Sequence, residues 1–346
     1  MRKSGTLRRL YPPVISALLV CTGCAASHPP GTATRPPPSA TTLTTLASTT
    51  TTSALLPPST TTTTAPAPPT TAAAAPPAPI AQPGWTPGPG YGLWTPVGRT
   101  VGSTAAVYTT VLDHDRLPLG VAWMDTSRLR FVLYAGTSEP HGVWPDQGAV
   151  PPSLWNGLVA AFNSGFQLRQ SAGGWYDDGR AAVPLRAGGA SLVIYADGSA
   201  TVADWGRDAS LTAQVRAVRQ NLTLLVDGGK PTPAVYSSNP IATWGDPLHE
   251  NVYTWRSALG IDATGHLLYI AGPGLDPETL AAAMVAVGAL RAMELDINPE
   301  WLSYVSFTGV GSAITGVKLL DTMYFPTDHF LQPFWRDFVA VFARAD

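Results

Sequence analysis

A compositional boundary near residue 90 decides which part of this chain can fold. Residues 25–90 are dominated by Thr, Pro and Ala, and no acidic residue occurs before Asp113. A segment of this kind buries too little apolar surface to offset the entropy that it loses on ordering. We therefore predict a disordered stalk over residues 25–90 and one globular domain over residues 91–346, a length that suits a single large domain.

Residues 1–24 have the pattern of an export signal. Arg2 and Lys3 begin a basic segment, and the apolar run over residues 14–20 is too short to cross a bilayer. Small residues precede Cys24, which predicts a lipoprotein signal with a lipid on that cysteine. The lipid would anchor the protein at the outer face of the cytoplasmic membrane or in the cell wall. The alternative is ordinary signal-peptidase cleavage followed by secretion.

Charge and cysteine content exclude several classes of function. From residue 91 onward there are 23 acidic and 16 basic residues, a net charge of −7 with no long basic run, so nucleic acid is not expected as a partner. Cys21 and Cys24 are the two cysteines, and both lie in the signal, so we expect a domain without disulfides. The histidines lack the spacing of metal ligands, and we expect no metal or other cofactor.

Short apolar runs separated by turn signals recur throughout the domain. This pattern predicts an α+β fold with a mixed or antiparallel β-sheet core and few helices. Two hairpins are expected, one turning at Asp197-Gly198 and the other over residues 262–265. Residues 119–124 and 129–134 are expected to form a strand pair around the turn between them.

Helix signals are few. Asp276 is a favourable N-cap residue and Pro277 suits the first turn. Leu280 and Met284 then fall four residues apart on one face, as in an amphipathic helix. A second helix is expected over residues 210–218.

A strand end with two carboxylates is the strongest candidate for a site. Residues 294–298 read Glu-Leu-Asp-Ile-Asn after an apolar run. Side chains alternate between the faces of a strand, so Glu294, Asp296 and Asn298 are expected to share one face. Two carboxylates on one face could reach a single bound sugar. The alternative is a solvated strand end without a ligand.

Two further polar residues follow or interrupt apolar strands. Arg256 lies within the apolar run Trp-Arg-Ser-Ala-Leu-Gly, where a guanidinium needs a partner. It could clamp a phosphate or carboxylate of a ligand, or it could form a structural ion pair. Asn163 follows a buried strand and could offer a ligand-binding amide or an Asx turn.

A turn and an aromatic residue complete the candidate site. Asp227 and Gly228 could bind a sugar hydroxyl, or they could simply form a turn. Trp301 follows the carboxylate strand and could provide a stacking platform for a sugar, although most tryptophans are expected in the core.

Four segments in order resemble the phosphodiester glycosidase family. The family patterns are Asn-Gly-Gly-Phe, Asn…Asp-Gly, Arg-Thr-Ala-hydrophobic-Gly and Asn-Leu-Asp-Gly-Gly-Gly-Ser-Ser. The corresponding segments here are residues 161–166, 221–229, 255–260 and 289–298. Asp296 matches the family's aspartate, whereas Glu294 replaces its asparagine and the glycine run is missing. The loss of glycines, which let a backbone approach a ligand closely, indicates a variant substrate.

The resemblance implies an exported hydrolase that cleaves a sugar-1-phosphodiester or related glycosidic bond in a cell-envelope glycan. Asp296 and Glu294 would then be the catalytic carboxylates, because glycosidases use such a pair. Arg256 would neutralise the leaving phosphate. The expected partner is a carbohydrate or sugar phosphate. The alternative is a non-catalytic glycan-binding or wall-organising lipoprotein with the same fold.

Overall fold

The computed structural model describes Ala75 and residues 92–247 and 251–344. The predicted signal with Cys24, and the predicted stalk apart from Ala75, lie outside the described residues. In the part of the chain that is described, no helix is both long enough and apolar enough to cross a membrane.

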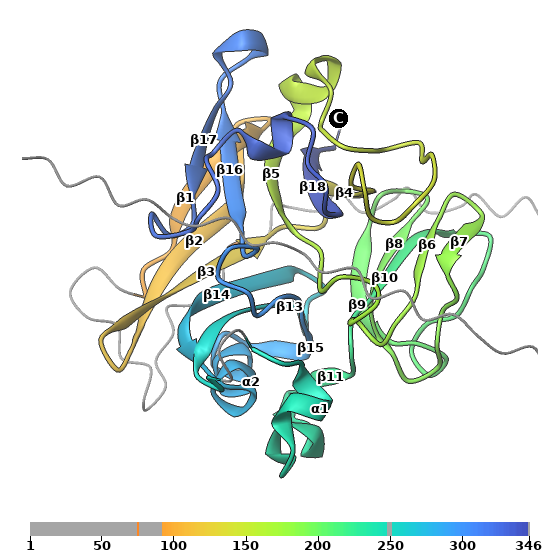
Figure 1. The fold of residues 1–346 in the computed structure, drawn as a ribbon. Helices are drawn as coiled ribbons and strands as arrows, with labels where there is room; N and C mark the ends of the chain where they lie inside the picture. Colours follow the sequence, from red (N-terminus) through yellow and green to blue (C-terminus); the bar gives the residue numbers. More distant parts are fainter. Residues whose placement is uncertain (1–74, 76–91, 248–250, 345–346) are drawn as a thin grey trace, which may run out of the picture. The chain divides into compact units, whose positions relative to one another are not determined.

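Three antiparallel sheets make up the described domain (Figure 1). The largest has eight strands in the order β1-β2-β3-β14-β13-β15-β11-β12. In that order its strands are Thr95–Val101, Thr104–His114, Leu117–Met124, Leu267–Leu275, Thr254–Asp262, Ala289–Glu294, Leu224–Asp227 and Lys230–Pro231. All pairings between its strands are antiparallel, which agrees with the predicted sheet core.

Two five-stranded sheets accompany it. One has the order β7-β6-β10-β8-β9, with strands Arg180–Val183, Trp175–Asp177, Val215–Gln220, Ala190–Tyr195 and Ala200–Asp204. The other has the order β17-β16-β5-β18-β4, with strands Thr315–Lys318, Tyr304–Thr308, Leu158–Asn163, Phe338–Ala343 and Leu129–Tyr134.

Helices are few among the described residues, as the α+β prediction expected. The α-helices of the described residues are α1 (Pro240–Trp244) and α2 (Pro277–Ala286). The 3₁₀ turns are Pro152–Gly157, Pro233–Tyr236, Gly311–Ala313 and His329–Leu331. The predicted helix start is confirmed, since the Asp276 side chain accepts a hydrogen bond from Thr279 N at 2.7 Å.

The eight-stranded sheet has two buried faces. Ala258 and Ala292 belong to the hydrophobic cluster that contains Leu280 and Met284 of α2. Leu259 and Met293, their neighbours in sequence, belong to the cluster on the opposite face. This second cluster also contains Phe162 of β5 and Tyr304 of β16, whose rings stack with centroids 6.0 Å apart. A polar group placed in this sheet is therefore removed from water on either face.

Both predicted hairpins are confirmed, as β8–β9 and β13–β14. The predicted pairing of residues 119–124 with 129–134 is wrong, because β3 and β4 lie in different sheets. Asp125 accepts bonds from the N–H and hydroxyl of Ser127 and redirects the chain between the two strands. The predicted helix over residues 210–218 is also wrong, because Val215–Gln220 is strand β10 between β6 and β8.

Candidate functional site

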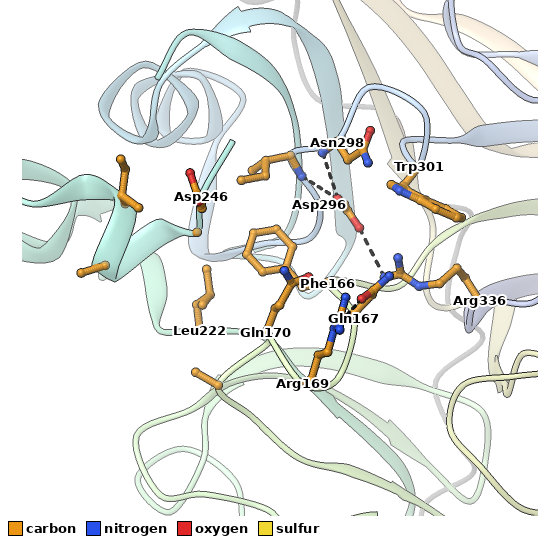
Figure 2. Close-up of a pocket in the computed structure, with 15 residues that line it drawn as sticks. Phe166, Gln167, Arg169, Gln170, Leu222, Asp246, Asp296, Asn298, Trp301 and Arg336 are labelled. Carbon is orange, nitrogen blue, oxygen red and sulfur yellow. Dashed lines mark hydrogen bonds and ion pairs between the residues drawn. The ribbon is translucent and has the colours of Figure 1, made fainter. Parts of the chain in front are cut away.

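A cavity of about 420 Å³ lies beside the ends of β5 and β15 and beside α1 (Figure 2). Its volume falls within the range of small-molecule sites. The residues that line it are Phe166, Gln167, Arg169, Gln170, Ala172, Leu222, Ile241, Ala242, Gly245, Asp246, Asp296, Ile297, Asn298, Trp301 and Arg336. Apolar side chains and a few charged groups thus face one concave space.

Asp296 is the best-positioned carboxylate of this cavity. Its Oδ1 accepts hydrogen bonds from the backbone N–H of Ile297 at 2.8 Å and of Asn298 at 3.0 Å. Its Oδ2 lies 3.4 Å from Nη2 of Arg336 (Figure 2). One oxygen is therefore fixed by the turn that follows β15, and the other faces a guanidinium.

The environment brings the pKa of Asp296 close to neutrality. Burial raises the pKa of this carboxyl to about 6, since only 5% of the residue is exposed. Arg336 and the two backbone N–H donors lower the pKa and offset part of this rise. At pH 7, Asp296 is therefore ionised in most protein molecules and protonated in a minority of them.

Arg336 is a second functional candidate that the sequence analysis did not select. Its Nη2 also donates to the carbonyl of Gly165 at 2.7 Å, and its Nε lies 3.4 Å from Oε2 of Glu139. The guanidinium carbon lies 5.0 Å from the ring centre of Trp301, as in a cation–π contact. In the sequence, Arg336 precedes Asp337 and an apolar strand, a pattern that indicates only a structural charge pair.

Glu294 does not line the cavity, although it was predicted to share a face with Asp296. It is fully buried, and its Oε1 lies 2.6 Å from Nη1 of Arg256. The other Arg256 donors bind backbone carbonyls, Nε that of Leu275 at 2.9 Å and Nη2 that of Val252 at 3.2 Å. Arg256 is thus engaged inside the protein, and the structure places neither member of this pair in the cavity.

A β-bulge explains why the predicted alternation fails. Ser257 of β13 accepts a bond from Leu295 N at 2.8 Å and donates its own N–H to Asp296 O at 2.9 Å. Two residues of one chain segment therefore oppose a single residue of the other, as in a bulge. Glu294 lies directly opposite Ala258, so it shares the face of the sheet that packs on α2. The extra residue turns Asp296 away from that face. The prediction of a shared face is therefore wrong.

Burial dominates the titration of Glu294. It raises the pKa of this carboxyl to about 7, and the nearby Asp296 raises it further, while Arg256 lowers it. Its Oε2 is buried without a hydrogen-bond partner among the described residues. The ion pair therefore carries a large desolvation cost in the sheet interior.

Asn163 lies beneath the cavity and does not line it. Its Oδ1 accepts from the Tyr269 hydroxyl at 2.7 Å and from Ser303 N at 3.2 Å. Its Nδ2 donates to Oγ of Ser257 at 3.1 Å, and this oxygen accepts from Asp296 N at 3.2 Å. The buried amide thus acts through Ser257 on the backbone of Asp296.

Asn221 makes a similar link that the sequence analysis did not single out. Its Nδ2 donates to the carbonyls of Glu294 at 2.9 Å and Leu295 at 3.1 Å, and its Oδ1 accepts from Phe166 N at 3.2 Å. One side chain therefore joins the end of β15 to the loop after β5. Its place in the second family-like segment was the available signal.

A buried ion pair between Arg219 and Asp337 supports the loop that follows β5. Arg219 Nε lies 2.7 Å from Oδ2 of Asp337, and both side chains are fully buried. Arg219 also donates to the carbonyl of Phe166, and Ser164 donates to that of Asp337 at 2.9 Å. The pair therefore fixes the loop on which Phe166 and its neighbours line the cavity.

Asp227 and Gly228 lie outside the cavity and form a turn. Asp227 ends β11 and pairs with Arg207 at 2.6 Å, on an exposed part of the surface. Gly228 and Gly229 have φ values of 58° and 73°, in the left-handed region that favours glycine. The turn alternative therefore accounts for these residues.

Asn298 and Trp301 line the cavity next to Asp296 (Figure 2). Asn298 Oδ1 accepts from Glu300 N at 3.0 Å, and its carbonyl accepts from Trp301 N at 2.8 Å, so this short turn presents both side chains. The indole of Trp301 also packs edge-on against Trp335, with ring centres 5.5 Å apart.

Asp246 is a further carboxylate at the cavity that sequence reasoning missed. It follows α1, is exposed, and lies across the cavity from Asn298 and Trp301 in Figure 2. The charged side chains that line this cavity are thus Asp246 and Asp296 with Arg169 and Arg336. Within residues 92–247 and 251–344, no three His, Cys, Asp or Glu side chains are arranged to hold a metal ion.

Searches with the sequence match no protein-family profile and no curated protein. The structure is similar to the catalytic domain of zebrafish N-acetylglucosamine-1-phosphodiester alpha-N-acetylglucosaminidase, auto-inhibited by its pro-peptide. The TM-score is 0.44 at 14% identity, over 73% of this chain and 88% of that one.

Two bacterial structures are also similar. A hypothetical protein from Synechocystis gives a TM-score of 0.39 at 11% identity, over 72% of this chain and 64% of that one. A Burkholderia pseudomallei protein described as exported gives 0.29 at 14% identity, over 70% of this chain and 75% of that one. These similarities concern the path of the backbone alone.

Proposed function

We propose that the protein hydrolyses a glycosidic bond to phosphate, the sugar-1-phosphodiester linkage of a cell-envelope glycan. The observation that supports this most is Asp296, a buried carboxylate that faces a 420 Å³ cavity beside Arg336. A carboxylate and an arginine would stabilise the two opposite charges that develop when this bond breaks. The sugar carbon becomes positive, and the departing phosphate gains negative charge.

In this proposal Asp296 stabilises the oxocarbenium-like transition state at the anomeric carbon. Its Oδ1 is held by two backbone donors and stays in place during the reaction. Preorganised charge of this kind lowers the barrier without a cost of reorganisation. Asn163 and Asn221 are positioning residues, because they hold the backbone around Asp296 from beneath.

Water supplies the second half of the reaction. A water molecule attacks the anomeric carbon, its proton passes to the carboxylate of Asp246, and the bond from the carbon to the phosphate oxygen breaks. The phosphate monoester leaves as an anion, so it needs charge neutralisation more than protonation. Arg336 and Arg169, which both line the cavity, supply that positive charge.

The test is release of free sugar by the purified protein from a panel of sugar-1-phosphodiesters, beginning with N-acetylglucosamine 1-phosphodiesters. We expect Asp296→Asn to lower kcat/KM by about 10³-fold, the loss of roughly 4 kcal/mol of transition-state stabilisation. Asp227→Asn is the matched control, since Asp227 lies on the surface beside Arg207, and it should keep wild-type activity. No release from any diester, or an active Asp296→Asn, would contradict the proposal.

The position of Glu294 favours one alternative, a glycan-binding protein without catalysis. Glycosidases use two carboxylates, and the buried Glu294 is paired with Arg256 outside the cavity. Asp246→Asn distinguishes the two functions. A hydrolase that uses Asp246 loses at least tenfold in kcat, whereas a binding protein shows tight glycan binding and no turnover in either form.

We further propose that the protein is exported and carries a lipid on Cys24. The support is the signal pattern of residues 1–24. Mass spectrometry of the membrane fraction tests this: a diacylglyceryl mass on Cys24, lost in Cys24→Ser, is expected. A mature protein that starts at another residue and carries no lipid would replace this proposal with secretion.

A further inference from the structure

A second cavity of about 610 Å³ adjoins the first one. Both cavities are lined by Gln167, Arg169 and Arg336, so these three residues form the wall between them. The remaining residues of the second cavity are Ser138, Glu139, Pro140, His141, Leu168, Ala182, Val183 and Trp335. A ligand that reaches past the shared wall from Asp296 would enter this space.

The wall between the cavities carries positive charge. Arg336 spans it, with Nη2 at 3.4 Å from Asp296 on one side and Nε at 3.4 Å from Glu139 on the other. Arg169 is exposed, and its Nε donates to Oε1 of Gln167 at 2.8 Å. No carboxylate forms an ion pair with Arg169 within the described residues, so its charge is available to an anion at the wall.

The far side of the second cavity is mainly apolar. Ala182 and Val183 come from β7, and Pro140, Leu168 and Trp335 come from three separate loops. Trp335 is 48% exposed, so its ring offers apolar surface to this space. Glu139 is already occupied, because its Oε1 accepts from Leu168 N at 2.7 Å and its Oε2 faces Arg336. An apolar group is therefore the chemistry that this space accommodates best.

We infer that the second cavity binds the leaving side of the substrate, an alkyl chain joined to the phosphate. This inference rests on the proposed function, since it extends the same site. The sugar lies beside Asp296, the phosphate lies at Arg169 and Arg336, and the chain lies along Ala182, Val183 and Trp335. The substrate class is thus a sugar phosphate esterified to a lipid-like chain, rather than one that joins two sugars.

The test compares octyl phosphate, which carries the anion and an alkyl chain, with methyl phosphate, which carries the anion without the chain; neither contains a sugar. Titration calorimetry on the full-length protein is expected to give an affinity for octyl phosphate at least 30-fold above that for methyl phosphate. Val183→Asp places a carboxylate on the apolar far side of the second cavity. It should lower the affinity for octyl phosphate at least tenfold and change the affinity for methyl phosphate less than twofold. If the aspartate variant does not fold, Val183→Thr replaces it, since threonine keeps the side-chain shape. This variant should also lower the affinity for octyl phosphate selectively, by a smaller factor.

Val317→Asp is the matched control. Val317 is an exposed strand residue that lines neither cavity, so both affinities should stay within twofold of the wild type. Equal binding of the two phosphates overturns the inference, and so does an octyl preference that Val183→Asp leaves intact. Because neither probe contains a sugar, these outcomes are independent of whether the protein hydrolyses a sugar-1-phosphodiester.

Discussion

Two carboxylate–arginine pairs have carboxylates only two positions apart in the sequence, Glu294 and Asp296, yet the two pairs differ in their surroundings. Glu294 and Arg256 are 2.6 Å apart and almost completely buried, and the remaining Arg256 donors bind two backbone carbonyls. Asp296 and Arg336 are 3.4 Å apart and line a cavity. The first pair has no room for a ligand between its members, whereas the second faces space that a ligand can fill.

The comparison shows that proximity in sequence and identical chemistry do not define a site. The short pair lies in the sheet interior away from the cavity, so its main effect is on the stability of the fold. The longer pair is held in place by other groups, Asp296 by backbone N–H donors and Arg336 by Gly165 and Trp301. Both of its charges therefore remain available to a substrate.

The largest expected effect comes from breaking the buried pair. Glu294→Gln leaves the Arg256 charge uncompensated inside the sheet, and such losses cost roughly 3–5 kcal/mol of unfolding free energy. Urea unfolding should be measured at pH 8, above the pKa of about 7 to which burial raises Glu294, so that the carboxylate is ionised in the reference protein. A raised pKa means that ionising Glu294 itself lowers the stability of the folded state, so we expect the net loss at the lower end of this range. Glu300→Gln, at an exposed position, should change stability by less than about 0.5 kcal/mol. A loss below 1 kcal/mol for Glu294→Gln would remove the distinction between the pairs.

Arg336→Lys should affect activity rather than stability. A lysine keeps the charge but lacks the planar fork that reaches Gly165, Asp296 and Glu139 together. We expect kcat/KM to fall about 100-fold, or roughly 2.7 kcal/mol. Arg207→Lys, on the exposed surface, is the control and should change kcat/KM less than twofold. Wild-type turnover in Arg336→Lys would show that the cavity pair takes no part in the reaction.

An apolar replacement sharpens the structural role of the buried pair. Glu294→Leu combined with Arg256→Met removes both charges and keeps much of the volume, which is often neutral for buried pairs. The double variant should recover about 2 kcal/mol of the stability that Glu294→Gln loses, as measured in the same urea experiment. If the double variant is less stable than the single one, the bonds of Arg256 to Val252 and Leu275 outweigh its pairing with Glu294.

The smallest effect is the pH dependence of the cavity pair. The pKa of Asp296 is raised to about 6, and the proposed role needs the ionised form. Activity is therefore complete above pH 7 and is lost as the pH falls through 6, with kcat/KM at pH 5 about tenfold below the plateau. A pH–rate profile of the wild-type protein checks this. A rate that is constant from pH 5 to 8, or that rises toward acid, would assign the reaction to another group.

Much of the fold could be predicted from local patterns. The β8–β9 and β13–β14 hairpins follow from turn residues between apolar runs, and α2 follows from the cap at Asp276. The pairing of residues 119–124 with 129–134 failed, because sheet membership depends on partners far along the chain. β3 pairs with β2 and β14, whereas β4 pairs with β18.

The candidate site could be predicted only in part for the same reason. Asp296, Asn298 and Trp301 lie close together in sequence, and all three line the cavity. Glu294 was placed with them by strict alternation, but the bulge opposite Ser257 depends on the register of a different strand. Arg336 and Asp246 reach the cavity from distant segments, and neither position carries a local signal for it.

The most direct test of the central claim is a crystal structure of the Asp296→Asn variant, soaked with the sugar-1-phosphodiester that the wild-type protein hydrolyses fastest. We predict a ligand in the 420 Å³ cavity, with the anomeric carbon beside residue 296 and the phosphate on Arg336. A ligand bound outside this cavity at saturating concentration, with Arg336 still contacting only protein, would contradict it.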